Sequence, residues 1–274
     1  MSIDLREAGP LVLVGAGKMG GAMLAGWLDR GLPTEAVVVI EPRPAAELLA
    51  LAAARGVRIE AAAPAGLTAR VMVVAVKPQV LDEVLPPLAG LVAAETVVVS
   101  VVAGKTMAAF ARGLGAGRIV RTIPNTPSQV GRGITAAFAD AAVSASDRDL
   151  VSALLATLGR LEWVDAEGLI DVATAVSGSG PAYVFHMVEA LAAAGAAAGL
   201  EAELSARLAR ATVEGAGELL WQSPESPETL RKNVTSPGGT TAAALAVLMG
   251  EDGLTKLMSE AVAAAAKRSR ELAG

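Results

Sequence analysis

Two glycine-rich segments near opposite ends of the chain contain the residue types that bind anions. One is Val234-Thr-Ser-Pro-Gly-Gly-Thr-Thr241, which comes directly before the apolar run Ala242 to Leu248. Its hydroxyl side chains and glycines, with a proline suited to an early helical position, predict the start of a helix. The other is Gly15-Ala-Gly17-Lys-Met-Gly20, which follows the apolar run Leu11–Val14. Because the free N–H groups and the dipole of a helix start attract anions, the two segments indicate two different anionic ligands.

The N-terminal segment matches the pattern G-x-G-x-x-G between an expected strand and an expected helix. In such a turn the first glycine permits a tight bend, the second lets the backbone approach a pyrophosphate, and the third lets the helix pack closely on the strand. The alternative is a glycine-rich turn with no ligand. We expect a dinucleotide to contact Gly15, Ala16, Gly17, Lys18, Met19 and Gly20.

The end of the second expected strand bears on which dinucleotide is bound. Glu41 stands there, slightly beyond the usual spacing of about 20 residues for the acid that binds the ribose. Glu41 favours NADH, because a carboxylate accepts hydrogen bonds from the ribose hydroxyls. Arg43 favours NADPH, because a guanidinium binds the 2′-phosphate. A third interpretation is that Glu41 and Arg43 lie in a solvated loop and contact no cofactor. The sequence does not decide among the three interpretations.

Three further turns follow expected strands, at the edge of an open sheet where ligands bind. They are Ala75-Val-Lys-Pro78, Val102-Ala-Gly104 and Pro124-Asn-Thr-Pro127. The alternative is that their prolines and glycine only end the strands. The cofactor contacts expected from these turns are Ala75, Val76, Lys77, Pro78, Ala103, Gly104 and Asn125.

The first part of the chain alternates short β-branched runs with helical patterns. Runs of valine and isoleucine with little alternation are typical of parallel strands buried on both faces. Strands are expected at Leu11–Val14, Ala36–Ile40, Val71–Val76, Thr96–Val101, Arg118–Ile123, Ile134–Phe138 and Leu161–Val164. Helices are expected at Lys18–Arg30, Ala45–Arg55, Val80–Leu91, Met107–Leu114 and Asp147–Leu158. The alternation predicts an α/β fold with a doubly wound, Rossmann-like sheet.

After about Asp165 only helical patterns remain. They cover Gly168–Val176, Pro181–Ala198, Glu201–Gln222, Pro227–Asn233, Thr241–Met249 and Leu254–Glu271. We therefore expect a dinucleotide-binding domain at 1–164 and an all-α domain for substrate and dimerisation at 165–274. The segment Ala190–Leu200 is almost entirely alanine, glycine and leucine. A helix that is apolar on all sides is buried, and so small a domain has little interior, so this helix is expected to pack against a second subunit rather than within its own monomer.

Composition excludes several classes of function. The 274 residues contain no cysteine and one histidine, which argues against thiolate chemistry and histidine-rich metal centres, and no metal is expected. The net charge of −5 argues against a general nucleic-acid binder. No apolar run approaches the ~18–20 residues that span a bilayer, and the start Met1–Glu7 lacks the basic and apolar regions of a secretory signal. We expect a cytoplasmic protein that acts on a small molecule.

A third small-residue segment makes the pattern specific. Ser177-Gly-Ser-Gly-Pro-Ala-Tyr183 is expected to form a turn that leads into the helix from Pro181. Together with Pro124-Asn-Thr-Pro127 and Thr235-Ser-Pro-Gly-Gly-Thr-Thr241, in that order and spacing, it resembles the pyrroline-5-carboxylate reductases, which catalyse the last step of proline biosynthesis. The resemblance runs from Gly15 to Thr241 and thus covers nearly the whole chain.

The resemblance implies hydride transfer from NADPH or NADH to 1-pyrroline-5-carboxylate. It also implies a Rossmann domain followed by a helical domain that interlocks with its partner in a homodimer, or in a multiple of dimers. The family's substrate loop corresponds here to Ser236, Gly238, Gly239, Thr240 and Thr241. The substrate is a cyclic imine with a carboxylate, so backbone N–H groups of this loop are expected to hold the carboxylate. The hydroxyl of Thr241, the expected catalytic group, would then reach the ring nitrogen.

Two other functions fit parts of the same pattern. A β-hydroxyacid dehydrogenase shares the two-domain architecture but requires a positioned acid–base group such as lysine. Lys232, Lys256 and Lys267 of the helical segment lie outside the glycine-rich turns. A nucleotide-binding sensor without catalysis is the other alternative, and the intact substrate-type loops argue against it. Since fold alone does not establish function, the reductase interpretation rests on the loops.

Overall fold

The structure is a computed structural model that describes residues 4–115 and 117–273, so Met1 to Ile3 of the start considered above lie outside it. The chain forms two compact units. One runs to Ser179 and takes up the chain again from Ala265, and the other is Gly180–Ala264. The domain division expected after residue 164 stays a prediction, because compactness alone does not decide where a functional domain ends.

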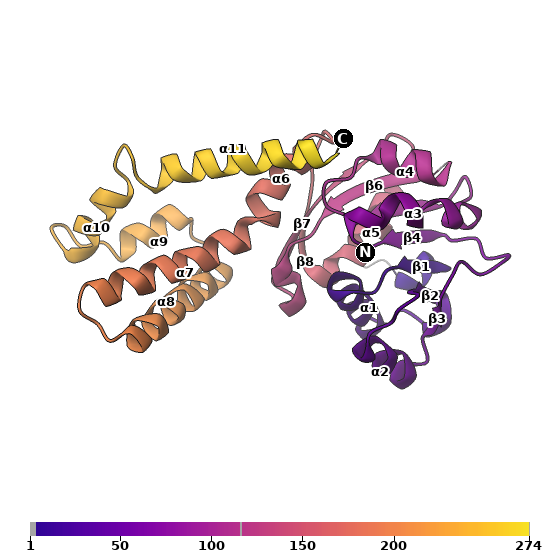
Figure 1. The fold of residues 1–274 in the computed structure, drawn as a ribbon, viewed down its shortest axis with the longest axis horizontal. Helices are drawn as coiled ribbons and strands as arrows, with labels where there is room; N and C mark the ends of the chain where they lie inside the picture. The colour runs from indigo at the N-terminus through magenta and orange to yellow at the C-terminus, as the bar shows by residue number, and fades with distance from the viewer. Residues whose placement is uncertain (1–3, 116, 274) are drawn as a thin grey trace. The chain divides into compact units, whose positions relative to one another are not determined.

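An eight-stranded sheet forms the centre of the first unit (Figure 1). Its spatial order is β3-β2-β1-β4-β5-β6-β7-β8. The strands are β1 Leu11–Val14, β2 Val37–Ile40, β3 Arg58–Glu60, β4 Val71–Val74, β5 Val97–Ser100, β6 Arg118–Ile123, β7 Gly133–Ala139 and β8 Gly159–Trp163. The first six are parallel and in the order of a dinucleotide-binding sheet, which confirms the predicted fold class.

Among the strand pairs within residues 4–115 and 117–273, only β6 and β7 are antiparallel. Nine residues separate the two strands, and they contain a single 3₁₀ turn, Thr126–Val130. A parallel pair needs a longer crossover, usually a helix, so this short link forces the chain to turn back. Helix α5 (Ala145–Leu155) supplies such a crossover between β7 and β8, which are again parallel.

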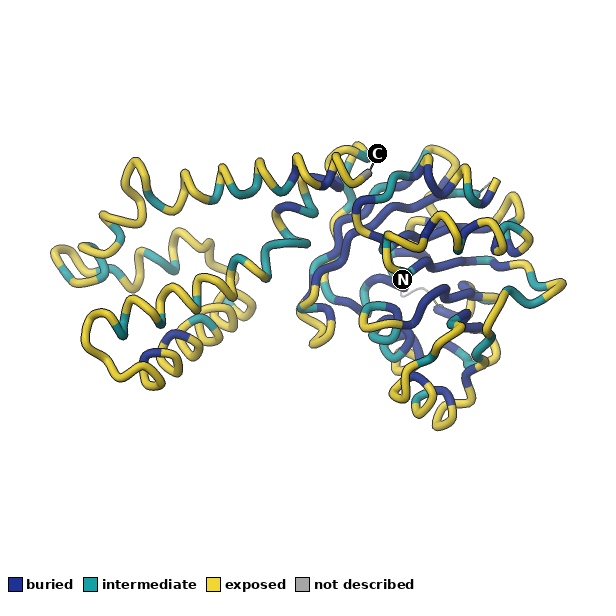
Figure 2. Tube along the Cα trace, viewed as in Figure 1, coloured by how far each residue is buried: buried dark blue, intermediate teal, exposed yellow. Residues whose placement is uncertain are grey.

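Helices cover both faces of the sheet, which is why its inner strands β1, β2, β4 and β5 are almost continuously apolar. Every residue of these four strands is buried, as Figure 2 shows. On one face, side chains such as Leu13 and Val73 pack with α1 (Lys18–Asp29), α2 (Ala46–Arg55) and α5. On the other face, alternate residues such as Met72 pack with α3 (Leu81–Val84) and α4 (Met107–Leu114). Every second residue of a strand points to the same face, so the two layers use alternate side chains of the same strands.

Two element predictions for this unit are corrected. The helix expected over Val80–Leu91 is the short α3 followed by a 3₁₀ segment, Pro86–Leu91. Prolines 86 and 87 lack the N–H that a continuing α-helix needs and clash with the preceding turn. The edge strand β3 was not expected, because three residues with one apolar side chain between two charged ones give almost no strand pattern.

Asp147 fixes the start of α5 to the sheet. Its carboxylate accepts hydrogen bonds from Arg70 (2.6 Å) and Arg118 (2.9 Å), and it forms a capping box with Ser144. Burial raises the pKa of this carboxyl, but the hydrogen bonds from Arg70, Ser144 and Arg118 outweigh burial and lower its pKa to about 2. Asp147 is therefore ionised and paired with both arginines near neutral pH.

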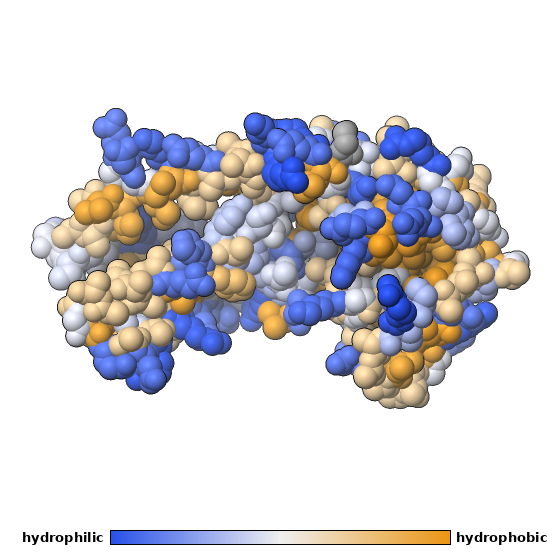
Figure 3. Space-filling view, viewed as in Figure 1, coloured by the Kyte–Doolittle hydropathy of each residue, from blue (hydrophilic) through white to orange (hydrophobic). Residues whose placement is uncertain are grey.

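The second unit is helical and strongly exposed. It contains α7 (Gly180–Ala197), α8 (Ala202–Gln222), α9 (Pro227–Asn233), α10 (Thr240–Leu248) and the first part of α11 (Leu254–Ala273). In Figure 2 these helices are largely exposed, and Figure 3 shows apolar side chains on their surface. No residue of α7 is buried, and Phe185 on it is 63% exposed. Within the described ranges no helix is long and apolar enough to cross a bilayer. An apolar helix left open in one chain needs another surface to cover it.

Candidate active site

The glycine-rich turn after β1 has the geometry that its sequence predicts. Gly15 has φ = +83°, a conformation that side-chain-bearing residues rarely adopt. A Cβ at Gly20 would stand 2.2 Å from the carbonyl oxygen of Gly15, so this glycine permits the close approach of α1 to β1. A Cβ at Gly17 would meet no atom within 4 Å. Gly17 and Lys18 are exposed at the N-terminus of α1, and backbone there is open to a ligand.

Glu41 connects the end of β2 to the glycine-rich turn. One carboxylate oxygen accepts the N–H of Ala16 and the other accepts the N–H of Arg43, both at 3.1 Å. The half-buried carboxylate is thus held in one position beside the turn, and each oxygen keeps capacity for a further donor. The side chain of Arg43 is exposed. These hydrogen bonds exclude the third interpretation of Glu41 and Arg43, in which Glu41 is freely solvated.

The next two candidate loops lie beside the turn at the carboxyl ends of β4 and β5. Ala75 follows β4, and its N–H donates to the carbonyl of Val14 at 2.8 Å, so β4 ends at Val74 and not at Val76 as expected. Val76 is half-buried and Lys77 is exposed. Because strand order reverses between β1 and β4, this is the crevice where open α/β sheets bind ligands.

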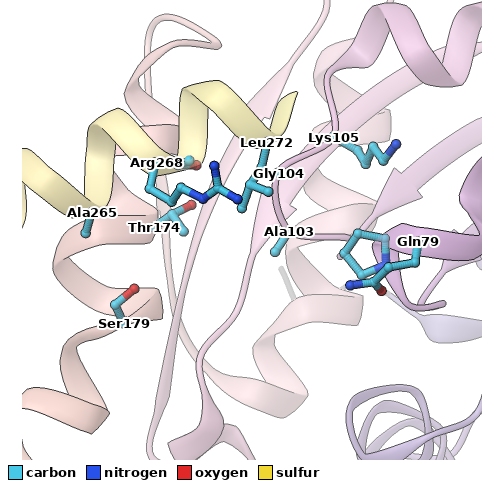
Figure 4. A pocket seen from close by; sticks show the side chains of 11 residues that line it. Gln79, Ala103, Gly104, Lys105, Thr174, Ser179, Ala265, Arg268 and Leu272 are labelled. Atoms are coloured by element: carbon cyan, nitrogen blue, oxygen red, sulfur yellow. The ribbon is translucent and has the colours of Figure 1, made fainter. Parts of the chain in front are cut away.

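A cavity of about 430 Å³ lies in the first unit where these loops end (Figure 4). Pro78 and the loop Ala103-Gly104-Lys105 form part of its wall. Thr174 and Ser179 and the last turns of α11 form the rest, and the α11 side chains are Ala265, Arg268, Ser269 and Leu272. Of the cofactor residues expected from the sequence, Pro78, Ala103 and Gly104 are brought together here.

Asn125 is buried and already engaged within the protein. Its Nδ2 donates to the carbonyl of Ser177 at 3.1 Å, and its Oδ1 accepts the N–H of Ile134 at 3.0 Å. The segment that it contacts is not the simple turn expected at Ser177–Tyr183. Thr174–Gly178 is a π-helical turn that continues α6 (Leu169–Ala173), and the bend at Ser179 precedes α7. The hydroxyl of Ser177 donates to the carbonyl of Ala173, which keeps the chain helical.

The predicted substrate loop precedes α10 in the second unit. Gly239 is the N-cap residue and has no side chain to bond the first N–H groups of the helix. Ser236, Gly238 and Thr240 are exposed, and Thr241 is half-buried. Pro237 was expected in the first helical turn, but it lies before the N-cap, because Gly238 has φ = +70° and cannot continue a right-handed helix. The loop therefore presents unpaired backbone donors beside two threonine hydroxyls.

Known proteins share both halves of this arrangement. Residues 167–272 match the family model described as pyrroline-5-carboxylate reductase dimerisation, and residues 10–104 match NADP oxidoreductase coenzyme F420-dependent. A pyrroline-5-carboxylate reductase of Synechocystis sp. is 40% identical over 264 residues, which are 96% of this chain and 97% of that protein. The chain belongs to the pyrroline-5-carboxylate reductase family.

Solved structures of this family agree with the fold. A pyrroline-5-carboxylate reductase of Coxiella burnetii is 34% identical and has a TM-score of 0.88, with 97% of this chain and 99% of that chain covered. A Plasmodium falciparum pyrroline carboxylate reductase with NADP bound is 27% identical and has a TM-score of 0.74, with 98% and 99% covered. The predicted family, the Rossmann-like domain and an oxidoreductase that depends on NAD(P)H are thereby confirmed, and the chain carries a dimerisation domain.

Sequence reasoning missed the part that α11 plays. The turns from Ala265 onward belong to the first compact unit and line its cavity, and no residue of this helix was expected at the site from the sequence. One signal was present, because Arg121 stands inside an expected buried strand and a buried arginine needs partners. Nothing local in the sequence identifies those partners. Among residues 4–115 and 117–273, no group of three His, Cys, Asp or Glu side chains is arranged to hold a metal.

Proposed function

We propose that this reductase transfers hydride from a nicotinamide cofactor to the C=N carbon of 1-pyrroline-5-carboxylate and forms L-proline. The observation that carries the proposal is the loop Ser236–Thr241, whose uncapped helix start suits a small carboxylate. The relatives named above carry the same activity in their names. The cofactor supplies the hydride, and the chain binds and orients the two reactants.

The residues of the loop divide the binding of the substrate between its two polar groups. The backbone N–H groups of Thr240 and Thr241 donate to the carboxylate at the positive end of the helix dipole, whereas the N–H of Gly239, which was also expected to do so, already donates to the carbonyl of Ser236 at 3.0 Å. The Thr241 hydroxyl, which forms no hydrogen bond with another described residue, accepts the N–H of the protonated imine. The protonated C=N bond takes up hydride at carbon while its electron pair moves to nitrogen, so the product is an amine and no strong acid is needed. Orientation is then the main contribution of the protein.

For the cofactor we propose a preference for NADH over NADPH. The carboxylate of Glu41 is fixed by Ala16 and Arg43 and has room to accept two ribose hydroxyls. A 2′-phosphate in the same place would meet a fixed negative charge. Arg43 is the residue that would oppose this preference, because its exposed guanidinium is free to approach a phosphate. The contacts proposed for the rest of the cofactor are the backbone of Gly15–Gly20, the loop Ala75–Pro78 and Ala103-Gly104. Asn125 is left out of this set, because both ends of its buried amide already bond to Ser177 and Ile134.

The proposal includes a homodimer, or a multiple of dimers, as the working form. The exposed apolar surface of α7 supports it, since Phe185 and Leu191 are 63% and 46% exposed in one chain. We also place the protein in the cytoplasm, where the reduced nicotinamide cofactors that this chemistry consumes are produced.

The test measures loss of nicotinamide absorbance with 1-pyrroline-5-carboxylate and either NADH or NADPH. Oxidation that depends on the imine is expected, and its absence in protein that binds nucleotide would refute the reductase function. Thr241→Ala removes the hydroxyl, and Thr241→Ser retains it. A hydrogen bond to a charged group contributes ~1.5–3 kcal/mol, so Thr241→Ala should lower kcat roughly 10- to 100-fold without changing cofactor affinity, and Thr241→Ser should recover most of the loss. Equal rates in the two variants would rule out the proposed role.

A further inference from the structure

A buried arginine in the first unit joins elements that are far apart in the sequence. Arg121 on β6 is 2% exposed. Its Nη2 donates to Asp171 of α6 at 2.8 Å, and its Nη1 donates to Glu167, just before α6, at 3.2 Å. A charge buried to this extent is tolerated only with such partners. If either carboxylate moved away, the buried guanidinium of Arg121 would lose a partner for its charge. Both carboxylates are therefore held in place.

Each of the two carboxylates also holds a second element. Glu167 accepts the N–H of Met107, the first residue of α4, at 2.8 Å. Asp171 accepts the hydroxyl of Ser269, near the end of α11, at 2.8 Å. Asp171 and Ser269 are 6% and 5% exposed, so water does not compete for this hydrogen bond. The arginine thus fixes the beginning of α4 and the end of α11 relative to β6.

Both of these helix ends adjoin the loop between β5 and α4. Residues 101–106 form this loop, which contains Ala103 and Gly104. A Cβ added to Gly104 would lie 3.2 Å from the Cβ of Leu272, so the last turn of α11 packs directly on Gly104. Ala103, Ser269 and Leu272 line the same cavity, and Figure 4 shows the α11 side chains facing the loop across it.

We propose that Ser269 is a positioning residue for the nicotinamide ring. Through Asp171 and Arg121 it holds the last turn of α11 against Gly104, and so fixes the wall of the cavity at the carboxyl ends of β4 and β5. The proposal rests on the reductase function proposed above. We assign the contact at Ala103 and Gly104 to the nicotinamide end of the cofactor, because the glycine-rich turn and Glu41 are the proposed sites of the pyrophosphate and the adenosine ribose. Adenosine and pyrophosphate bind elsewhere, at the glycine-rich turn and Glu41, so this hydrogen bond affects the geometry of hydride transfer more than cofactor affinity.

The experiment compares Ser269→Ala with Ser259→Ala in the full-length protein. Ser259 is on the same helix, is exposed, and donates only to the carbonyl of Thr255, one turn earlier. A displacement of about 1 Å in a reacting group can cost ~100-fold in rate. We expect Ser269→Ala to lower kcat roughly 10-fold while the Kd for NADH stays within about 2-fold. Ser259→Ala should match the wild type in both quantities.

Two results would overturn the proposal. One is a kcat for Ser269→Ala equal to that of Ser259→Ala. The other is a parallel loss of kcat and NADH affinity, which would mean that the hydrogen bond supports the whole cofactor site. If the wild-type protein does not reduce the imine, the proposed function fails separately. The fluorescence yield of bound NADH then tests the positioning role without turnover, since a displaced ring should lower this yield in Ser269→Ala and not in Ser259→Ala.

Discussion

The two glycines that flank the start of α1 give opposite predictions for the same substitution. At Gly17 a Cβ would meet no protein atom within 4 Å, and the backbone has φ = −68°, which alanine adopts. Alanine is a poorer N-cap than glycine, but it restricts the unfolded chain by ~0.4–1 kcal/mol, so the two effects largely cancel. Gly17→Ala should therefore leave the stability of the protein without cofactor within about 1 kcal/mol of the wild type.

At Gly20 the same methyl group would stand 2.2 Å from the carbonyl oxygen of Gly15, and ordinary contact begins only at 3.4 Å. Helix α1 would have to move from β1 by roughly 1 Å, and such overpacking typically costs ~1–3 kcal/mol. For a chain of this length the melting temperature should fall by roughly 2–10 °C. Gly20→Ala is thus expected to lose both stability and cofactor affinity, because the turn itself is displaced.

The assay is thermal unfolding without cofactor, followed by titration with NADH and detection of its fluorescence. Gly17→Ala should unfold as the wild type does but bind NADH roughly 10- to 100-fold more weakly, which is ~1.4–2.8 kcal/mol. Gly21→Ala is the matched control, since its Cβ would lie 3.7 Å from the Ala16 carbonyl oxygen and alanine favours the helix. It should bind NADH normally and melt no earlier. Wild-type affinity in Gly17→Ala would refute the placement of the pyrophosphate at this turn.

Three further substitutions test other parts of the structure. Asp147 has its pKa lowered to about 2 from 3.8, so its stabilisation is complete above about pH 4 and is lost as pH falls toward 2. Asp147→Asn should therefore cost about 2 kcal/mol at pH 7, and a stability difference from the wild type that persists undiminished at pH 2 would contradict the pairing. Glu41→Gln should raise the NADPH-to-NADH ratio of kcat/KM roughly 10-fold, and an unchanged ratio would remove Glu41 from cofactor selection. Asn125→Ala leaves the N–H of Ile134 unpaired and should destabilise the protein by ~1–3 kcal/mol in denaturant unfolding, whereas a neutral effect would mean that water replaces the amide.

The parts of the fold that the sequence predicts well are those determined by neighbouring residues. The strand Leu11–Val14 was placed with its observed bounds, because two helical layers require a continuous apolar run there. The strand Arg118–Ile123 was also placed with its observed bounds, from its β-branched residues. The turn Gly15–Gly20 was predictable for a similar reason, since Gly15 has a positive φ and Gly20 packs on the carbonyl of Gly15. Helix Met107–Leu114 likewise has its N-cap threonine and its left-handed Gly115 beside it in the sequence.

The parts that were missed depend on distant partners or on competing local effects. Ser269 gains its role from Asp171, which is 98 residues earlier, and a single sequence contains no signal for that pairing. Ser177 and Gly178 were expected to begin a turn because serine and glycine favour turns, but they are the last residues of the π-helical turn Thr174–Gly178, in which the Ser177 hydroxyl donates to the carbonyl of Ala173. The position of Pro237 was misjudged because Gly238, with its positive φ, separates Pro237 from the helix, which begins at Thr240.

The helix starts at Gly17 and Gly239, which first indicated two anionic ligands, differ in a way that matches the cofactor and the substrate proposed for them. At Gly15–Gly20 the backbone is fixed before any ligand arrives, because Gly20 packs on Gly15 and Glu41 holds the N–H of Ala16. Such a turn suits a long cofactor that must be held at several points. The start of α10 lacks a side-chain cap just as the start of α1 does, but its first two helical residues are the threonines Thr240 and Thr241. Its N–H groups and hydroxyls are therefore gathered within one turn, which suits a single small carboxylate that serves as the cap of the helix.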